Sequence, residues 1–230
     1  MPAGAAPAAA RATAPKAVTK RPPSRRMAPD EREHQIVRAA VALFAERGLS
    51  GSTRELARRL GIAQPLLYRY FPTKAKLIDR VFEEVFLTRW RPEWEDHIED
   101  ESRPLEERLV EFYVEYSRAM LQRDWIRILM FSGLDGADVV ERLLARLRSR
   151  IFVRVVRAIR RAQGLPTDPA TFTDMDYEIV WSLHASIFYI GIRRWVYGLP
   201  MREDTAELVR ALVRSFLRGA PAMIGLPKNR

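Results

Sequence analysis

The sequence predicts an all-α fold, and three observations indicate it. From Asp30 onward, apolar residues recur at spacings of three and four, as in Ile36, Ala39, Ala40, Leu43 and Phe44. Glycines stand at or just past the ends of these periodic segments, where helices commonly end. No stretch shows the alternation of apolar and polar residues that is typical of a strand.

The composition narrows the class of protein. The chain has 230 residues, of which 47% are hydrophobic, so it is long enough for one large or two small domains with real cores. Cysteine is absent, which excludes disulfides and thiolate chemistry and suits the cytoplasm, where we expect the protein to be located. No apolar run approaches the roughly 18 residues of a membrane span. The three histidines His34, His97 and His184 are scattered, so we expect neither a metal nor a cofactor.

The charge favours an anionic partner. The net charge is +10 and the pI is near 10.3. Nucleic acid is the commonest partner of so basic a chain. The alternative is a generally basic surface without a partner, which would give the same net charge and pI. Residues 1–29 are rich in Ala and Pro and contain six basic residues but no acidic one. We expect this segment to be disordered, either as an arm that contacts DNA or as a solvated tail.

The first helical part is predicted over residues 30–90. A helix ends at Gly48, Thr53 is expected to cap a short second helix that ends at Gly61, and a third short helix follows at 64–70. Thr73 is then expected to cap a longer helix. Two short helices joined by a glycine-containing turn are typical of a helix-turn-helix, in which the second helix lies in the major groove of DNA. Residues 53–76 carry six basic residues against one acidic residue, as phosphate binding requires.

The second helical part is predicted over residues 104–222. Residues 91–103 are polar and bounded by prolines, and we interpret them as a joint between the two parts. Five helices are expected after it, at roughly 105–122, 125–132, 138–163, 175–197 and 205–218. Gly133, Gly164, Gly198 and Gly219 are expected to mark their ends, and 223–230 form a short tail.

The stretch from Ile36 to Phe82 resembles the N-terminal domain of the tetracycline-repressor (TetR) family of bacterial transcription regulators. The matches keep the family's spacing throughout and are Ala39, Ala40, Leu43, Phe44, Gly48, Thr53, Leu56, Ala57, Gly61, Ile62, Leu67, Tyr68, Tyr70, Phe71, Lys74 and Leu77. The remainder of the chain matches the family only in length and helical character.

The resemblance implies roles for individual residues. Thr53, Tyr68 and Lys74 fall where the family binds phosphates, and Gln64 and Leu66 fall where it reads base edges. The expected DNA-binding set also includes Arg54, Pro65 and Arg69, whereas Leu67 and Tyr70 are expected to pack in the core. Ala63 replaces the family's usual serine, and Pro65 and Leu66 replace smaller or hydroxylated residues, so the preferred base sequence stays open.

The resemblance also implies an effector cavity and a homodimer. The last two long helices, at 175–197 and 205–218, would form the dimer, with two reading helices about 34–36 Å apart on a palindromic operator. The residues expected to line the cavity are Phe112, Tyr116, Met120, Trp125, Met130, Phe131, Trp181, His184 and Phe188, with Tyr113 and Tyr189 nearby. Ordinary core packing is the alternative for each of them, and His184 by itself is typical of a core histidine.

Six arginines follow one side of the 138–163 segment, namely Arg142, Arg146, Arg150, Arg154, Arg157 and Arg161. At 3.6 residues per turn they lie within an arc of roughly 120°. We interpret this arginine stripe as a solvated face that is partly paired with acidic residues elsewhere. The alternative is a site for an anionic effector, such as an acyl-CoA, a phosphate or a carboxylate.

The function expected from the sequence is therefore a bacterial, DNA-binding transcription regulator. A homodimeric repressor released by an unidentified small molecule fits best, although activation stays open. A nonspecific, architectural DNA-binding protein is the first alternative, and only a steep sequence preference would separate the two. An all-α enzyme is less favoured, because no H-E-x-x-H, P-loop or G-x-S-x-G motif occurs and Glu99-Asp100-Glu101 is the nearest acidic cluster.

Overall fold

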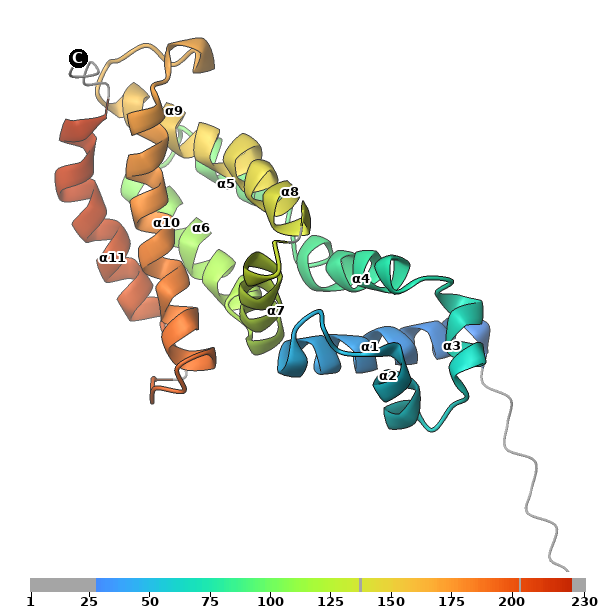
Figure 1. The fold of residues 1–230 in the computed structure, drawn as a ribbon. Helices are drawn as coiled ribbons and strands as arrows, with labels where there is room; N and C mark the ends of the chain where they lie inside the picture. The colour runs from blue at the N-terminus through green and yellow to red at the C-terminus, as the bar shows by residue number, and fades with distance from the viewer. Residues whose placement is uncertain (1–27, 137, 203, 225–230) are drawn as a thin grey trace, which may run out of the picture.

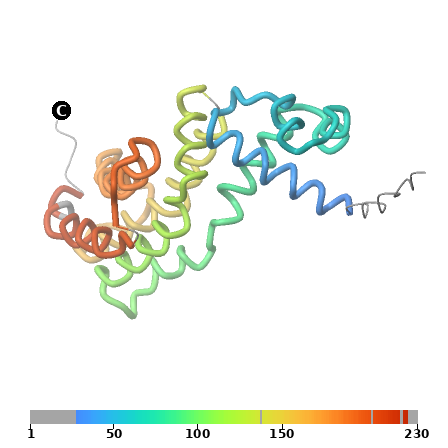
Figure 2. Tube along the Cα trace, turned by 90° about the horizontal axis from the view of Figure 1, so that it is seen from below, coloured from blue at the N-terminus to red at the C-terminus, as the bar shows by residue number. Residues whose placement is uncertain are grey.

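The computed structural model describes residues 28–136, 138–202 and 204–224. Within these ranges the chain forms helices joined by loops, and none of them contains a strand, so the prediction of an all-α fold is confirmed. Helices α1 to α4 lie at one end of the molecule and α10 and α11 at the other, with α5 to α9 between them (Figures 1 and 2).

The N-terminal domain consists of α1 (Pro29–Arg47), α2 (Thr53–Leu60), α3 (Gln64–Tyr70) and α4 (Lys74–Phe82). Each helix contributes apolar residues to one shared core. The wholly buried members are Ile36, Ala40 and Leu43 from α1, Leu56 from α2, Leu67 from α3 and Leu77 from α4. Because α2 and α3 bury only their inner sides, their outer sides stay available to solvent.

One predicted helix cap is wrong. Ser52, not Thr53, caps α2, because its side chain accepts a hydrogen bond from the amide of Glu55 at 3.1 Å. Thr53 is the first residue inside the helix, which leaves its hydroxyl group available for other partners. The predicted cap at Thr73 is confirmed, since its side chain accepts a hydrogen bond from the Lys76 amide.

The C-terminal domain contains seven α-helices in the described residues. They are α5 (Glu93–Glu99), α6 (Leu105–Met120), α7 (Arg123–Leu134), α8 (Asp138–Leu147), α9 (Val153–Ala162), α10 (Asp174–Trp195) and α11 (Ala206–Gly219). Two 3-10 turns, η3 (Pro169–Thr171) and η4 (Ala220–Met223), stand before α10 and after α11. Helix α11 packs along α6 and α10, and α7 packs against α1 of the N-terminal domain.

The segment 91–103, predicted to be a joint, contains the helix α5. Trp94 and Ile98 stand four residues apart on one side of α5 and are wholly buried. This side packs against α6 and α9, while three glutamates, Asp96 and His97 occupy the rest of the helix. The sequence prediction failed because two apolar residues among many acidic ones were too weak a periodic signal.

The predicted helix at 138–163 is one helix with an interruption. The turn η2 (Arg148–Phe152) has π-helical geometry and separates α8 from α9. A second π-helical turn, η1 (Glu83–Leu87), extends α4. Such turns widen a helix locally and are frequent at functional sites.

Other boundaries differ by a few residues. Gly133 lies inside α7, which continues to Leu134. Helix α10 begins at Asp174, because Thr173 and Asp176 form a capping box there. The predicted tails at 1–29 and 223–230 lie mostly outside the described residues, but Pro29 already belongs to α1 and Met223 to η4.

Candidate functional site

The turn between α2 and α3 has the geometry that a helix-turn-helix needs. Gly61 adopts a left-handed conformation with φ of 64°, which glycine tolerates without strain. The amide of Ile62 donates a hydrogen bond to the carbonyl oxygen of Ala57 at 3.0 Å and so closes the turn. Pro65 lies in the first turn of α3, where its missing amide proton costs no helical hydrogen bond.

Three of the predicted DNA-binding residues form a small polar network that joins α2 to α3. The hydroxyl groups of Thr53 and Tyr68 lie 3.1 Å apart, and Gln64 Nε2 donates a hydrogen bond to Thr53 Oγ1 at 3.3 Å. The Tyr68 side chain is 40% exposed. The network therefore holds a phenol, an amide and a hydroxyl group at the solvent-facing side of the two helices, as contacts to phosphates and bases require.

Cationic side chains flank this network. Arg54 and Arg69 are exposed and Lys74 is half-buried. None of the three forms an ion pair with a described residue. Arg59 differs, because it is paired with Glu46 and Glu55, each at 2.9 Å. Its guanidinium group lowers the pKa of the Glu46 carboxyl, so Arg59 contributes to the fold as well as to the local charge.

The packing residues of α3 are placed as predicted. Leu67 is wholly buried, and Tyr70 is half-buried against the core. Pro65 is exposed and Leu66 is half-buried at the start of the helix. The structure thus gives α3 one core side and one solvent side, and the predicted DNA-binding residues lie outside the wholly buried core.

A cavity of about 100 Å³ lies within the C-terminal domain. It is lined by Trp90, Tyr116, Met120, Trp125, Leu129, Leu143, Leu144, Leu147, Trp181, His184 and Phe188. Trp90 comes from the segment after η1, and the other lining residues come from α6, α7, α8 and α10. The cavity is therefore enclosed by residues from most of the helices of this domain.

Six of the nine predicted cavity residues line it, namely Tyr116, Met120, Trp125, Trp181, His184 and Phe188. Three do not. Phe112 is buried in an aromatic cluster with Trp94, Met130 is half-buried against the core, and Phe131 packs on Gly48, with its ring 3.1 Å from where a β-carbon would be. Phe131 therefore belongs to the contact between α7 and the end of α1.

Sequence reasoning missed five lining residues. Leu143, Leu144 and Leu147 lie on α8 beside the arginine stripe, Leu129 lies on α7, and Trp90 follows η1. The i, i+4 spacing of Leu143 and Leu147 beside the arginine stripe was the signal that α8 presents an apolar side inward.

The polar atoms around the cavity are few and incompletely paired. Tyr116 Oη lies 3.5 Å from His184 Nε2. His184 Nδ1 and Trp125 Nε1 are buried and have no hydrogen-bond partner among the described residues. Burial lowers the pKa of the His184 imidazole to about 3 and raises the pKa of the Tyr116 phenol above its usual range, so both are neutral at physiological pH.

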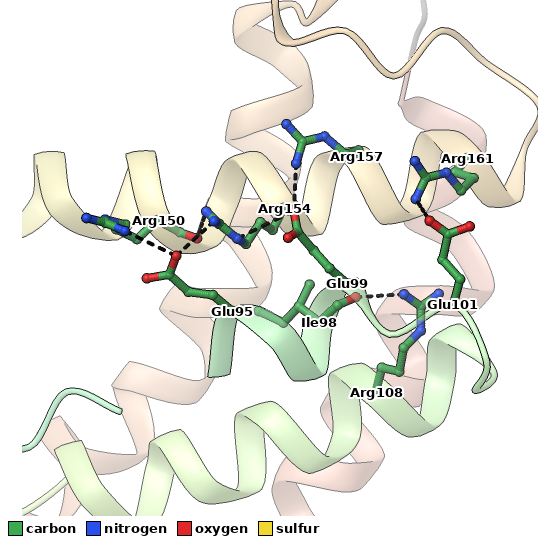
Figure 3. A network of polar contacts seen from close by, with 9 residues as sticks. All are labelled: Glu95, Ile98, Glu99, Glu101, Arg108, Arg150, Arg154, Arg157 and Arg161. Carbon is green, nitrogen blue, oxygen red and sulfur yellow. Dashed lines mark hydrogen bonds and ion pairs between the residues drawn. The ribbon is translucent and has the colours of Figure 1, made fainter. Parts of the chain in front are cut away.

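The arginine stripe is largely neutralised by acidic residues, many of them on α5 or just after it. Figure 3 shows Arg150 and Arg154 directed to Glu95, and Arg154 and Arg157 directed to Glu99. Arg161 pairs with Glu101. The two remaining members face α4 and the segment after it: Arg142 pairs with Asp79, and Arg146 lies over the Trp90 ring.

These contacts support the interpretation of the stripe as a paired, solvated face. An anionic effector would have to displace carboxylates that already occupy the guanidinium groups. The pairing was not predictable from the sequence in detail, because the acidic residues were assigned to a joint.

One group of potential metal ligands occurs in the described residues. His97, Glu111 and Glu115 offer ligand atoms within 4.8 Å of one another. Both carboxylates already have cationic partners, since Glu111 pairs with Arg103 and Glu115 lies 3.9 Å from Arg91 Nη1. Glu115 also accepts a hydrogen bond from Trp94 Nε1 at 3.1 Å. The pairing leaves little negative charge uncompensated for a cation.

Comparison with known proteins agrees with the helix-turn-helix geometry. The family model described as "Bacterial regulatory proteins, tetR family" matches residues 36–81, which run from α1 to α4. The helix-turn-helix is therefore a TetR-family DNA-binding domain. The protein is a transcriptional regulator.

The similarity to a known transcriptional regulator extends beyond the DNA-binding domain. The HTH-type transcriptional regulator HbdR of Aromatoleum sp. (strain CIB) is 25% identical over 209 residues, which cover 87% of this chain and 88% of that protein. The class A tetracycline repressor protein from transposon 1721 of Escherichia coli is 47% identical over 49 residues. That match covers 21% of this chain and 23% of the repressor.

Solved structures share the fold. A TetR-like transcriptional regulator from Rhodococcus sp. RHA1 superposes with a TM-score of 0.62 at 18% identity, covering 84% of this chain and all of that one. The C-terminal domain therefore shares its fold with that regulator. Across the described residues, no helix combines the length and the apolar character that crossing a bilayer demands.

Proposed function

We propose that this protein is a homodimeric TetR-family repressor that binds a palindromic operator and is released from it by a small molecule. The observation that carries the proposal is the polar network of Thr53, Gln64 and Tyr68 on the solvent side of α2 and α3, flanked by cations that form no ion pair with a described residue. It combines groups that bind phosphates with an amide that can read a base.

The proposed DNA contacts divide into two kinds. Lys74, Arg54 and Tyr68 are positioned for phosphates, which bind them whatever the base sequence. Gln64, at the start of α3, is positioned for base edges, and a glutamine amide can donate to and accept from adenine in the major groove. Pro65 and Leu66 are proposed to contact the apolar parts of neighbouring bases, such as a thymine methyl group.

The proposed dimer forms through α10 and α11, at the end of the molecule opposite α3 (Figure 1). Large apolar side chains are exposed there, including Met175 and Tyr189 on α10 and Leu208 on α11. Small residues lie exposed between them, namely Ser182, Ala185, Ser186, Ala211 and Ser215. Such a surface allows two copies to approach closely and to bury apolar area.

The proposed release by a ligand rests on α8, which borders both the cavity and α4. Leu143 and Leu147 line the cavity. From the same helix, Arg142 lies 3.7 Å from Asp79 and its guanidinium carbon lies 5.7 Å from the centre of the Phe82 ring. A ligand that displaces α8 would therefore move α4, and with it the spacing of the two α3 helices in the dimer.

The first experiment is a selection of bound sequences from random duplex DNA, followed by titration of the enriched duplex and a scrambled one. The titrations are made at about 100 and about 200 mM salt, because nonspecific binding depends steeply on salt. A palindromic sequence bound at least about a thousandfold tighter than the scrambled duplex supports the proposal. No enrichment, together with a collapse of affinity at the higher salt, would favour the architectural alternative instead.

A further inference from the structure

The walls of the cavity indicate the chemistry of its ligand. All eleven lining residues are uncharged at physiological pH. Nine of them are leucine, methionine, phenylalanine or tryptophan, and the other two are Tyr116 and His184. A charged ligand would lose its hydration there without gaining an opposite charge, which costs far more than burying an apolar one. The arginines next to lining residues on α8 are directed elsewhere: Arg142 to Asp79, Arg146 to the Trp90 ring and Arg148 to the Tyr177 ring.

Two polar atoms of the lining residues have no partner. Trp125 Nε1 and His184 Nδ1 are buried without a hydrogen bond among the described residues, and most buried polar groups in proteins are paired. The Trp125 ring is held in place by Phe86 and Phe188, with ring centres 5.3 and 5.9 Å away. This indole group is a donor only, so its natural partner is an oxygen or nitrogen that accepts.

His184 is similarly fixed. Its ring packs edge-on against Phe152 and Trp181, with centres 5.3 and 5.8 Å away, and its Nε2 faces the Tyr116 hydroxyl group. If Tyr116 donates to Nε2, then Nδ1 carries the proton and donates; if Tyr116 accepts, Nδ1 accepts. A hydroxyl group on the ligand suits either arrangement, because it can donate and accept.

An exposed groove adjoins the cavity. Leu144 and Trp181 line both of them, and the groove also includes Glu141 and Arg148. Leu144 is 36% exposed. A ligand that entered by this groove would pass between α8 and α10.

From these observations we propose that the effector is an uncharged, mainly apolar ring compound that carries a hydroxyl or carbonyl oxygen. That oxygen accepts a hydrogen bond from Trp125 Nε1 and, when it is a hydroxyl group, also bonds to His184 Nδ1. The inference rests on the proposed function, because it assigns the ligand class of the cavity through which release is proposed. The cavity of about 100 Å³ is somewhat smaller than one of about 150 Å³ that admits benzene, so a single ring requires modest movement of Met120 and Leu144.

The test uses three single-ring probes that differ in one property each, and isothermal titration calorimetry of the full-length protein at neutral pH. Phenol carries the hydroxyl group, benzene lacks it, and benzoate carries a charge. We expect phenol to bind roughly tenfold tighter than benzene, since the hydroxyl group supplies partners that both buried atoms lack. Benzoate is expected to give no measurable binding.

Two tryptophan variants show whether the preference arises at the proposed atom. Trp125→Phe keeps an aromatic ring but removes the indole donor, and we expect it to reduce the preference for phenol over benzene severalfold while benzene still binds. Trp195→Phe is the matched control, because Trp195 does not line the cavity and its Nε1 donates to the Leu121 carbonyl oxygen at 2.8 Å. Its phenol preference should equal that of the wild type, and circular dichroism establishes that both variants are folded.

The possible outcomes test the proposed ligand class separately from the proposed regulatory function. Failure of phenol to bind, tighter binding of benzoate than of phenol, or an unchanged preference in Trp125→Phe would each overturn the proposed ligand class. None of these results depends on DNA, so operator binding measured on the same preparation tests the proposed function independently.

Discussion

Arg160 Nη1 lies 2.8 Å from Asp176 Oδ2, and both side chains are buried. The same guanidinium group donates through Nε to the Pro166 carbonyl oxygen at 2.7 Å. The same carboxylate accepts a hydrogen bond from the Thr173 amide at 2.9 Å. One ion pair thus joins the end of α9, the connection after it and the first turn of α10, one of the two helices proposed for the dimer.

Replacing Asp176 by asparagine is expected to lower the free energy of unfolding by about 3–5 kcal/mol, because it leaves the Arg160 charge buried without its partner. Urea unfolding followed by circular dichroism measures the loss. Arg161→Gln is the control, since it breaks the exposed pair with Glu101 and should cost at most about 1 kcal/mol. Equal losses in the two variants would mean that the buried pair has no special role.

The stability of the protein is expected to depend on pH through His184. Its pKa is about 3 in the folded chain and has the ordinary value of 6.5 when unfolded. The unfolded chain therefore binds a proton that the folded chain does not as the pH falls below 6.5, and this difference destabilises the fold. Between pH 7 and pH 5 the contribution is about 2 kcal/mol.

This prediction is checked by urea unfolding of the wild type and His184→Phe at several pH values from neutral to mildly acidic. The variant keeps an aromatic ring but cannot titrate, so its free energy of unfolding should fall less steeply over this range. Parallel curves for the two proteins would show that His184 does not carry the effect.

Gln64→Ala is expected to weaken binding to the selected operator by about 1–3 kcal/mol while leaving binding to scrambled DNA almost unchanged. The reason is that its amide is proposed to read a base edge, and only the operator has the matching base. Fluorescence anisotropy with both duplexes measures the two affinities. An equal loss on both duplexes would instead assign Gln64 to the phosphates, or to holding Thr53 in place.

Lys74→Met should behave in the opposite way. It removes one proposed phosphate contact, so it should weaken all duplexes alike and reduce the slope of log affinity against log salt by about 1. Arg218→Met, at the far end of α11, changes the net charge equally and is the control. The assignment fails if the two variants show the same salt slope.

The sequence predicted the DNA-binding domain closely because its signals are local. Gly48, Gly61 and Thr73 mark helix ends through backbone conformation and capping, which depend on neighbours in the chain. The exception was Ser52, since two adjacent hydroxyl residues could each have capped α2 and only the structure shows which one does.

The C-terminal domain was less predictable because its features depend on contacts distant in sequence. Trp94 is buried only because α6 and α9 pack over it. Phe131 does not line the cavity, contrary to the sequence prediction, because its side chain packs on Gly48. Likewise, no local pattern shows that Glu95 and Glu99 meet arginines more than 50 residues further along the chain. Spacing predicted which residues share a side of a helix, but not which helix that side would meet.

The pairing of the arginine stripe with acidic residues also determines where the positive charge of the protein acts. Five of its guanidinium groups have a carboxylate beside them, so their fields largely cancel within a few ångströms. Arg54, Arg69 and Lys74 have no such carboxylate among the described residues, and their field extends into solvent. Near a duplex, the phosphates therefore attract these three cations beside α3 more strongly than they attract the paired arginine stripe.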